Sequence, residues 1–134
     1  MPAGYAGTPL AKKLGFKPGA PLWVSGMPTA VKAELDAQVM PRYLARPTKA
    51  LAAAHIFHTR AAKLAAELEG LRAKLAPDGV IWVSWPKKAS KMETDITEDV
   101  IRAIALPLGL VDVKVCAVDE TWSGLKLVIR KALR

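Results

Sequence analysis

The chain contains few of the residues that mark a disulfide-linked or reactive protein. Its 134 residues include one cysteine, two histidines and 6% aromatic residues. A single cysteine excludes an internal disulfide and is typical of a reducing compartment, so we expect a cytoplasmic protein. This residue, Cys116, lies in the middle of an expected strand. We therefore expect its thiol to be buried and unreactive.

Several common site motifs are also missing. The chain has no Walker phosphate-binding loop, no Gly-x-Ser-x-Gly nucleophile elbow and no Cys-x-x-Cys pair. The two histidines, His55 and His58, are three residues apart on an expected strand. This spacing places them on opposite faces, so they cannot share a metal ion, and we expect no metal site. His58 ends the strand, which leaves it either as a core or rim residue or as part of a site.

Long apolar runs are absent as well. The first fourteen residues, MPAGYAGTPLAKKL, contain no apolar stretch of about 7–15 residues, so we expect no signal peptide. Other apolar runs stop far short of the roughly 18 residues that a membrane span needs. We therefore expect no membrane partner.

Positive charge is abundant. Twenty Lys and Arg residues against twelve Asp and Glu give a net charge of +8. Residues 1–60 hold eight Lys and Arg against Glu34 and Asp36, a balance of +6, whereas residues 61–134 hold twelve against ten, a balance of +2. A basic half predicts an anionic partner, from a phosphorylated small molecule to nucleic acid, unless the charge only solubilises the surface. No strand interleaves basic and aromatic residues in the manner of RNA-binding proteins, which disfavours nucleic acid.

The first half of the chain predicts short helices and strands. Thr8 followed by Pro9 is typical of a capped helix start, and Gly15 of a helix end. Pro41 and Pro47 bracket a weak strand signal. The expected elements are a helix over 10–14, a strand over 21–25, a helix over 29–38 and a strand over 40–46.

The signals become stronger after residue 51. Four leucines, at 64, 68, 71 and 75, have the spacing of one helical face, and the sequence Pro-Asp-Gly at 77–79 is expected to stop that helix. Asp95 and Glu98 have the form of a capping box. The expected elements are a strand over 53–58, a helix over 60–75, a strand over 80–85, a helix from 95 closed at 107–109, and strands over 111–118 and 125–130 joined by a hairpin turn.

Strands alternating with helices predict a parallel sheet with helices on both faces. The hydrophobic share of 51% is sufficient for a core. We therefore expect one α/β domain over 1–134, a Rossmann-like three-layer αβα fold. Its sheet should be mostly parallel, with about six strands and an antiparallel hairpin at the end.

Two resemblances support this expectation. LRAKLAPDGVIWVSW resembles the helix, proline-glycine turn and fifth strand of class I methyltransferases, and GLVDVKVCAVDETWSGLKLVIRK resembles their sixth and seventh strands. YAGTPLAKKLGFKPG, WVSWPKKAS and TDITEDVIRAIALPLGLVDVKVCAVDETWSGLKLVIRK resemble a bacterial family catalogued as domain of unknown function 3052. The first resemblance implies a methyltransferase fold. The second implies no established activity.

The residues that should hold S-adenosylmethionine depart from the methyltransferase pattern. That site needs a glycine-rich loop after the first strand and an acid at the end of the second, for the same reasons as in dinucleotide-binding folds. Here the first strand is followed by Gly26, Met27 and Pro28, and the second ends at Arg46. We expect no cofactor: S-adenosylmethionine is disfavoured, and so is NAD.

A candidate ligand site lies where the carboxyl ends of the parallel strands meet. The basic loop (residues 85–90, WPKKAS) and the acidic hairpin tip (residues 119–123) share this edge. Lys87 and Lys88 either form an anion-binding rim walled by tryptophans or pair with the acids as a latch. Such surface pairs contribute about 0–1 kcal/mol each. The candidate residues are Ser25, Gly26, His58, Trp85, Lys87, Lys88, Ser90, Asp119, Glu120 and Trp122.

These residues do not identify a reaction. We expect a module that binds a small anionic molecule or a protein partner through a degenerate methyltransferase-like cofactor site with a basic rim. One alternative is a diverged transferase acting on an anionic substrate. The other is an accessory protein that binds nucleic acid, which steep salt dependence of binding would reveal.

Overall fold

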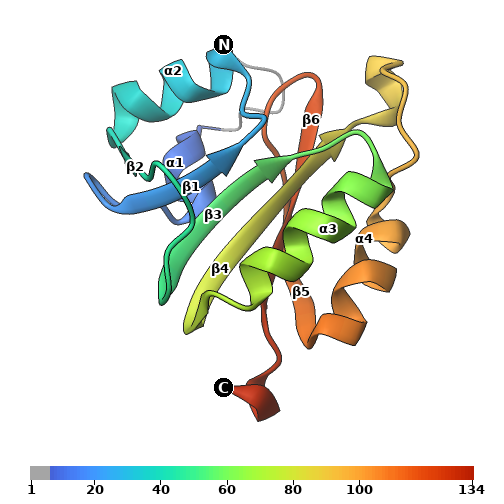
Figure 1. The fold of residues 1–134 in the computed structure, drawn as a ribbon. Helices are drawn as coiled ribbons and strands as arrows, with labels where there is room; N and C mark the ends of the chain where they lie inside the picture. Colours follow the sequence, from blue (N-terminus) through green and yellow to red (C-terminus); the bar gives the residue numbers. More distant parts are fainter. Residues whose placement is uncertain (1–6) are drawn as a thin grey trace.

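The computed structural model describes residues 7–134 (Figure 1). The expectation about a signal peptide and the start of the second resemblance rest partly on residues 1–6, which lie outside the described residues. The elements are α1 (Leu10–Leu14), β1 (Pro21–Ser25), α2 (Thr29–Gln38), β2 (Arg42–Tyr43), β3 (Leu51–Phe57), α3 (Ala61–Arg72), β4 (Leu75–Pro86), η1 (Lys88–Ser90), α4 (Glu98–Ala105), η2 (Leu106–Leu108), β5 (Leu110–Ala117), β6 (Trp122–Ile129) and η3 (Lys131–Leu133).

Six strands form one sheet in the order β2-β1-β3-β4-β6-β5. The pairs β1–β2, β1–β3 and β3–β4 are parallel, and β6 is antiparallel to both β4 and β5. Helices α3 and α4 cover one face, and α1 and α2 cover the other (Figure 1). The predicted Rossmann-like architecture, with a mostly parallel sheet closed by an antiparallel hairpin, is confirmed.

The sheet has a core on each face because successive strand side chains point to opposite sides. On β4, Ile81 and Val83 pack under α3 and α4, whereas Trp82 packs under α1. The indole of Trp82 also donates a hydrogen bond to the carbonyl of Leu14 at 2.9 Å. On α3, the predicted leucines at 64, 68 and 71 are buried.

Several predicted boundaries were wrong. Helix α3 ends at Arg72 rather than at residue 75, because Leu75 already pairs with Leu51 as the start of β4. The Pro-Asp-Gly sequence at 77–79 therefore lies within β4, where the register with β3 shifts, and does not simply stop a helix. A Cβ at Gly79 would lie 2.7 Å from the carbonyl oxygen of Leu51, so the bulge requires glycine there. The predicted strand over 40–46 shortens to β2.

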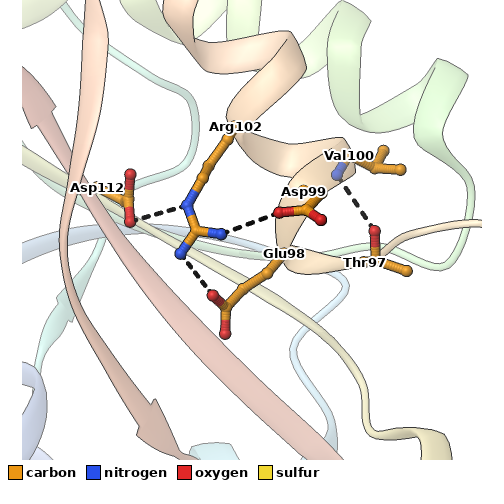
Figure 2. Close-up of polar contacts among 6 residues, drawn as sticks. All are labelled: Thr97, Glu98, Asp99, Val100, Arg102 and Asp112. Carbon is orange, nitrogen blue, oxygen red and sulfur yellow. Dashed lines mark hydrogen bonds and ion pairs between the residues drawn. The ribbon is translucent and has the colours of Figure 1, made fainter.

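The predicted capping box was also wrong. Helix α4 begins after Thr97, whose hydroxyl accepts the amide N–H of Val100 at 3.2 Å (Figure 2). The carboxylate of Asp95 instead accepts the amide N–H of Ala61 at 2.7 Å and so caps the start of α3. Likewise, the cap residue of α1 is Pro9, with no side-chain cap from Thr8.

An ion-pair cluster joins α4 to β5. The guanidinium of Arg102 donates to Asp112 at 3.1 Å, to Asp99 at 3.2 Å and to Glu98 (Figure 2). The hydrogen bonds to Asp112 and Glu98 raise the pKa of Arg102. Because Arg102 lies on α4 and Asp112 on β5, this cluster holds α4 against the terminal hairpin.

Within residues 7–134, no helix combines the length and the apolar character that crossing a bilayer requires.

Candidate functional site

The loops after the strands converge at one edge of the sheet, as the topology predicts. The register places Ser25 of β1 beside Ile56 of β3, and Phe57 beside Ser84 of β4. Pro86 of β4 lies beside Trp122 of β6. The segments that follow β1, β3 and β4 therefore lie at the same edge as the hairpin tip.

The basic loop is fixed by its own hydrogen bonds. The amide N–H of Lys87 donates to the carbonyl of Thr121 at 2.7 Å, which links the loop to the hairpin tip. The hydroxyl of Ser90 donates to the carbonyl of Lys87 at 2.7 Å and accepts the amide N–H of Met92 at 3.2 Å. Ser90, a candidate site residue, thus shapes the loop. Lys88 is exposed and Lys87 half-buried.

The acids of the hairpin tip do not pair with these lysines. One carboxylate oxygen of Asp119 accepts the amide N–H groups of Thr121 and Trp122, each at 2.8 Å, and so builds the turn. Among residues 7–134, no ion pair joins Asp119 or Glu120 to Lys87 or Lys88. The two acids line a shallow hollow against α2 together with Glu34. A latch built from ion pairs is therefore not seen; the contact between the loops is a backbone hydrogen bond.

The two tryptophans cannot form the walls of one pocket, and this part of the prediction was wrong. Trp85 is 8% exposed and belongs to the core under α3 and α4. Trp122 lies on the other face, where its ring centroid is 5.2 Å from that of Phe57. The reason is the strand period: Trp122 pairs with Pro86, one residue beyond Trp85, and neighbouring positions point to opposite faces.

Gly26 has a structural explanation. Its φ angle is +63°, and an added Cβ would lie 2.8 Å from the carbonyl oxygen of Phe57. Glycine is required for the loop after β1 to pass this close to β3. The single glycine of the loop is therefore accounted for without a cofactor.

A polar cluster that the prediction missed lies at the same edge, centred on Glu67 of α3. Its carboxylate accepts the Nε2–H of His58 at 2.6 Å and the indole N–H of Trp23 at 3.1 Å. The side chains of His58 and Glu67 are 14% and 19% exposed. Burial acts to raise the pKa of this carboxyl, but hydrogen bonds from its neighbours, including the hydroxyl of Ser25, outweigh burial and lower the pKa. Glu67 is therefore an ionised carboxylate held in a largely enclosed position.

The sequence does contain a signal for this cluster. Glu67 lies three residues after Leu64 and four before Leu71, so it shares their buried helical face. An acid on the apolar face of a helix needs a partner in the interior. His58 was a candidate, but the link between the two residues depends on how α3 packs on β1 and β3.

The other histidine lies on the opposite face, under α1. His55 is fully buried, its Nε2 is 2.7 Å from the hydroxyl of Ser84, and its ring lies 4.4 Å from that of Phe57. Burial lowers the pKa of His55 to about 3, so the ring is neutral at pH 7. Cys116 is half-buried rather than buried, and burial raises the pKa of its thiol, which keeps it protonated.

The second strand offers no acid for a ribose. Strand β2 ends at Tyr43, earlier than predicted, and residues 44–47 contain no Asp or Glu. The hydroxyl of Tyr43 donates to Asp36 at 2.8 Å, and the ammonium of Lys32 bonds to the same carboxylate at 2.9 Å. The nearby carboxylate of α2 is therefore already paired.

Comparison with known proteins identifies the fold and nothing finer. No family model matches the chain, and no curated protein matches it. The resemblance to domain of unknown function 3052 therefore stays a prediction. Several solved methyltransferases do match in structure. Magnesium protoporphyrin IX methyltransferase from Synechocystis, with bound SAH, is 13% identical with a TM-score of 0.59, over 90% of this chain and 79% of that one.

Two further structures give the same result. A SAM-dependent methyltransferase from Aquifex aeolicus is 13% identical with a TM-score of 0.58, over 90% of this chain and 88% of that one. The B. subtilis m1A22 tRNA methyltransferase TrmK is 12% identical with a TM-score of 0.59, over 94% of this chain and 67% of that one. The chain thus has the fold of class I S-adenosylmethionine-dependent methyltransferases. Similarity at this level of identity extends to the fold alone.

Proposed function

We propose that the chain is a ligand-binding module that uses the methyltransferase fold without its cofactor and binds a small anion at the basic loop. The observation that supports this most is the absence of a counter-charge. Lys87, Lys88 and Lys91 lie within five residues, and none of them pairs with a carboxylate of residues 7–134. Three neighbouring cations repel one another, and a bound phosphate or carboxylate relieves that repulsion.

The loop geometry favours this proposal. Hydrogen bonds within the loop and to Thr121 hold its backbone in place before any ligand arrives. A site that is already ordered loses less conformational entropy when it binds. The neighbouring loop after β1 contributes little to a cofactor site, since Gly26 is needed against Phe57 and Pro28 has no amide N–H.

The test compares two double variants of equal net charge. Lys87→Ala/Lys88→Ala removes the rim, and Lys49→Ala/Lys63→Ala removes two exposed lysines elsewhere. We expect the rim variant to bind pyrophosphate at least about tenfold more weakly in a calorimetric titration, in line with loss of charged hydrogen bonds. Its free energy of unfolding should change by less than about 1 kcal/mol. Equal binding by both variants, or unfolding of the rim variant alone, would contradict the proposal.

A second candidate, a diverged transferase acting on an anionic substrate, is favoured by the His58–Glu67 pair. Donation of the Nε2–H of His58 to a carboxylate leaves Nδ1 with a lone pair, and no described residue bonds to Nδ1. A histidine oriented by a carboxylate is a common general base. In this role His58 would take a proton from the acceptor group of a substrate held at the lysines.

This candidate has its own test. Labelled group donors would be offered to the protein together with anionic acceptors. Transfer by the unmodified protein that falls by about 100-fold or more in His58→Gln, and less in Glu67→Gln, would support it. Equal transfer by His58→Gln and the unmodified protein would exclude His58 as the base.

A further inference from the structure

A cavity lies on the α1 side of the sheet, at the end opposite the basic loop. Its volume is about 220 Å³. The connection from α1 to β1 forms one wall, and the first residues of β1 and β3 with part of β4 form the others. Its apolar lining includes Leu14, Phe16, Leu22, Pro41, Ala53 and Val80. We call this the α1-side cavity.

The walls of the α1-side cavity are held by hydrogen bonds from both ends of the connection. The indole of Trp82 bonds the carbonyl of Leu14, and the amide N–H of Gly19 donates to the carbonyl of Val39, both at 2.9 Å. Ala52 and Ala53 of β3, which also line the cavity, have small side chains. The cavity is therefore a formed feature of the fold and not a gap between mobile segments.

Two lysines line this apolar cavity, and no acid does. Lys17 comes from the connection and Lys126 from β6. Neither residue forms an ion pair with any of residues 7–134. Lys126 is half-buried, on a strand where Leu125 and Leu127 point to the other face.

A third lysine strengthens the positive potential. Lys114 of β5 pairs directly with Lys126 of β6, so the two cations lie side by side on one face. Like charges opposite each other destabilise a strand pair. The ammonium of Lys114 reaches the carbonyl of Lys13 at 3.2 Å, whereas the ammonium of Lys126 has no hydrogen-bond partner among the described residues. An anion at the mouth of the cavity would supply the missing partner.

We propose that the α1-side cavity binds a small organic acid, with its apolar body against the alanines and Phe16 and its carboxylate between Lys17 and Lys126. A cavity of about 150 Å³ admits benzene, so this one has room for a ring with a short side chain. The apolar lining disfavours a bare phosphate, and the lysines disfavour a neutral hydrocarbon. The site is separate from the basic loop and does not depend on the function proposed for it.

The experiment is a titration followed by amide chemical shifts of the full chain. The probes are 3-phenylpropionate, benzoate and 4-methylpentanoate, with 3-phenylpropionamide as the uncharged control. We expect saturable shifts at residues 14–17, Ala53 and Val80 for at least one acid. The amide of 3-phenylpropionate should bind at least fivefold more weakly than the acid.

Matched variants separate charge from shape. Lys126→Met keeps an apolar stem and should weaken binding of the acid at least fivefold, while Lys131→Met, which removes an exposed lysine, should not. Ala53→Leu should fill the cavity and abolish binding, with Ala62→Leu on the exposed side of α3 as its control. Lys87→Ala/Lys88→Ala should bind the acid as the unmodified protein does, which distinguishes this site from the basic loop.

Three results would overturn the proposal. One is the absence of saturable shifts at the cavity for all three acids. Another is equal affinity of Lys126→Met and the unmodified protein for the acid. The third is loss of binding in Lys87→Ala/Lys88→Ala but not in Lys126→Met, which would place the acid at the basic loop.

Discussion

The two faces of the sheet are built from different kinds of residue. Under α3 and α4 the core is mainly aliphatic, with Leu68, Ile81 and Leu127 all fully buried. Under α1 and α2 the face carries His55 and Ser84, which are the fully buried polar residues of the described chain. The first face therefore supplies most of the apolar burial that stabilises the fold. The second combines polar groups, lysines and an open cavity, which are features that stability alone does not require.

The largest expected effect comes from the aliphatic face. Leu68→Ala removes a fully buried side chain of α3 and should lower the free energy of unfolding by about 2–5 kcal/mol, through lost burial and a residual cavity. Urea unfolding measures this loss. The control is Leu106→Ala, since Leu106 is 55% exposed and should change stability by less than about 0.5 kcal/mol. Equal effects of the two substitutions would mean that Leu68 is not part of a stabilising core under α3 and α4.

A smaller, pH-dependent effect should come from the polar face. The pKa of His55 is about 3 in the folded chain, below its ordinary value of 6.5. Below pH 6.5 the unfolded state therefore binds a proton that the folded state does not, and stability falls as pH falls. Each pH unit below the pKa of the unfolded state corresponds to about 1.36 kcal/mol. Lowering the pH from 7.5 to 5.0 should therefore reduce the free energy of unfolding by about 2 kcal/mol.

The measurement is urea unfolding at the two pH values for the unmodified protein and for His55→Leu. The variant lacks the titrating ring, so its loss between pH 7.5 and 5.0 should be smaller by about 2 kcal/mol. The other titratable groups are the same in both proteins. If both lose the same free energy, His55 is not held neutral by the interior of this face.

The difference between the faces also explains what could be predicted from the sequence. Helix α3 was identified because its leucines repeat with the period of one helical face. Strand β4 was identified from its apolar run, and the hairpin of β5 and β6 from its turn residues. These are local patterns, and the mostly parallel sheet follows from the alternation of strands and helices.

Contacts between residues of different elements could not be predicted from local sequence patterns. Asp95 has the spacing of a cap for its own helix, yet it caps α3, because the segment before α4 runs beside the start of α3. The pairing of Glu67 with His58 needs three elements to meet. Trp85 and Trp122 looked like neighbours because both flank one edge, but the register places them on opposite faces. Each error concerns a partner that is distant in the sequence.

The smallest expected effect tests whether the α1 and α2 face keeps the cofactor site of the fold. The loop from β1 to α2 contains one glycine, which packs against Phe57, followed by a proline without an amide N–H. Strand β2 is followed by no acid in residues 44–47. S-adenosylmethionine should therefore find one backbone donor fewer in this loop and no acid for its ribose after β2, and should not bind tightly.

A thermal melt with saturating S-adenosylmethionine measures this directly. A ligand present at 100 times its dissociation constant stabilises the folded state by about 2.7 kcal/mol, which raises the melting temperature of a domain of this size by several degrees. We expect a shift below about one degree, equal to that caused by adenosine, which shares the nucleoside with S-adenosylmethionine, carries no phosphate for the basic loop and controls for weak non-specific binding. A shift of about five degrees with S-adenosylmethionine and none with adenosine would mean that the chain retains a cofactor site despite the single glycine of the loop. The chain would then be expected to use S-adenosylmethionine, as the methyltransferases of this fold do.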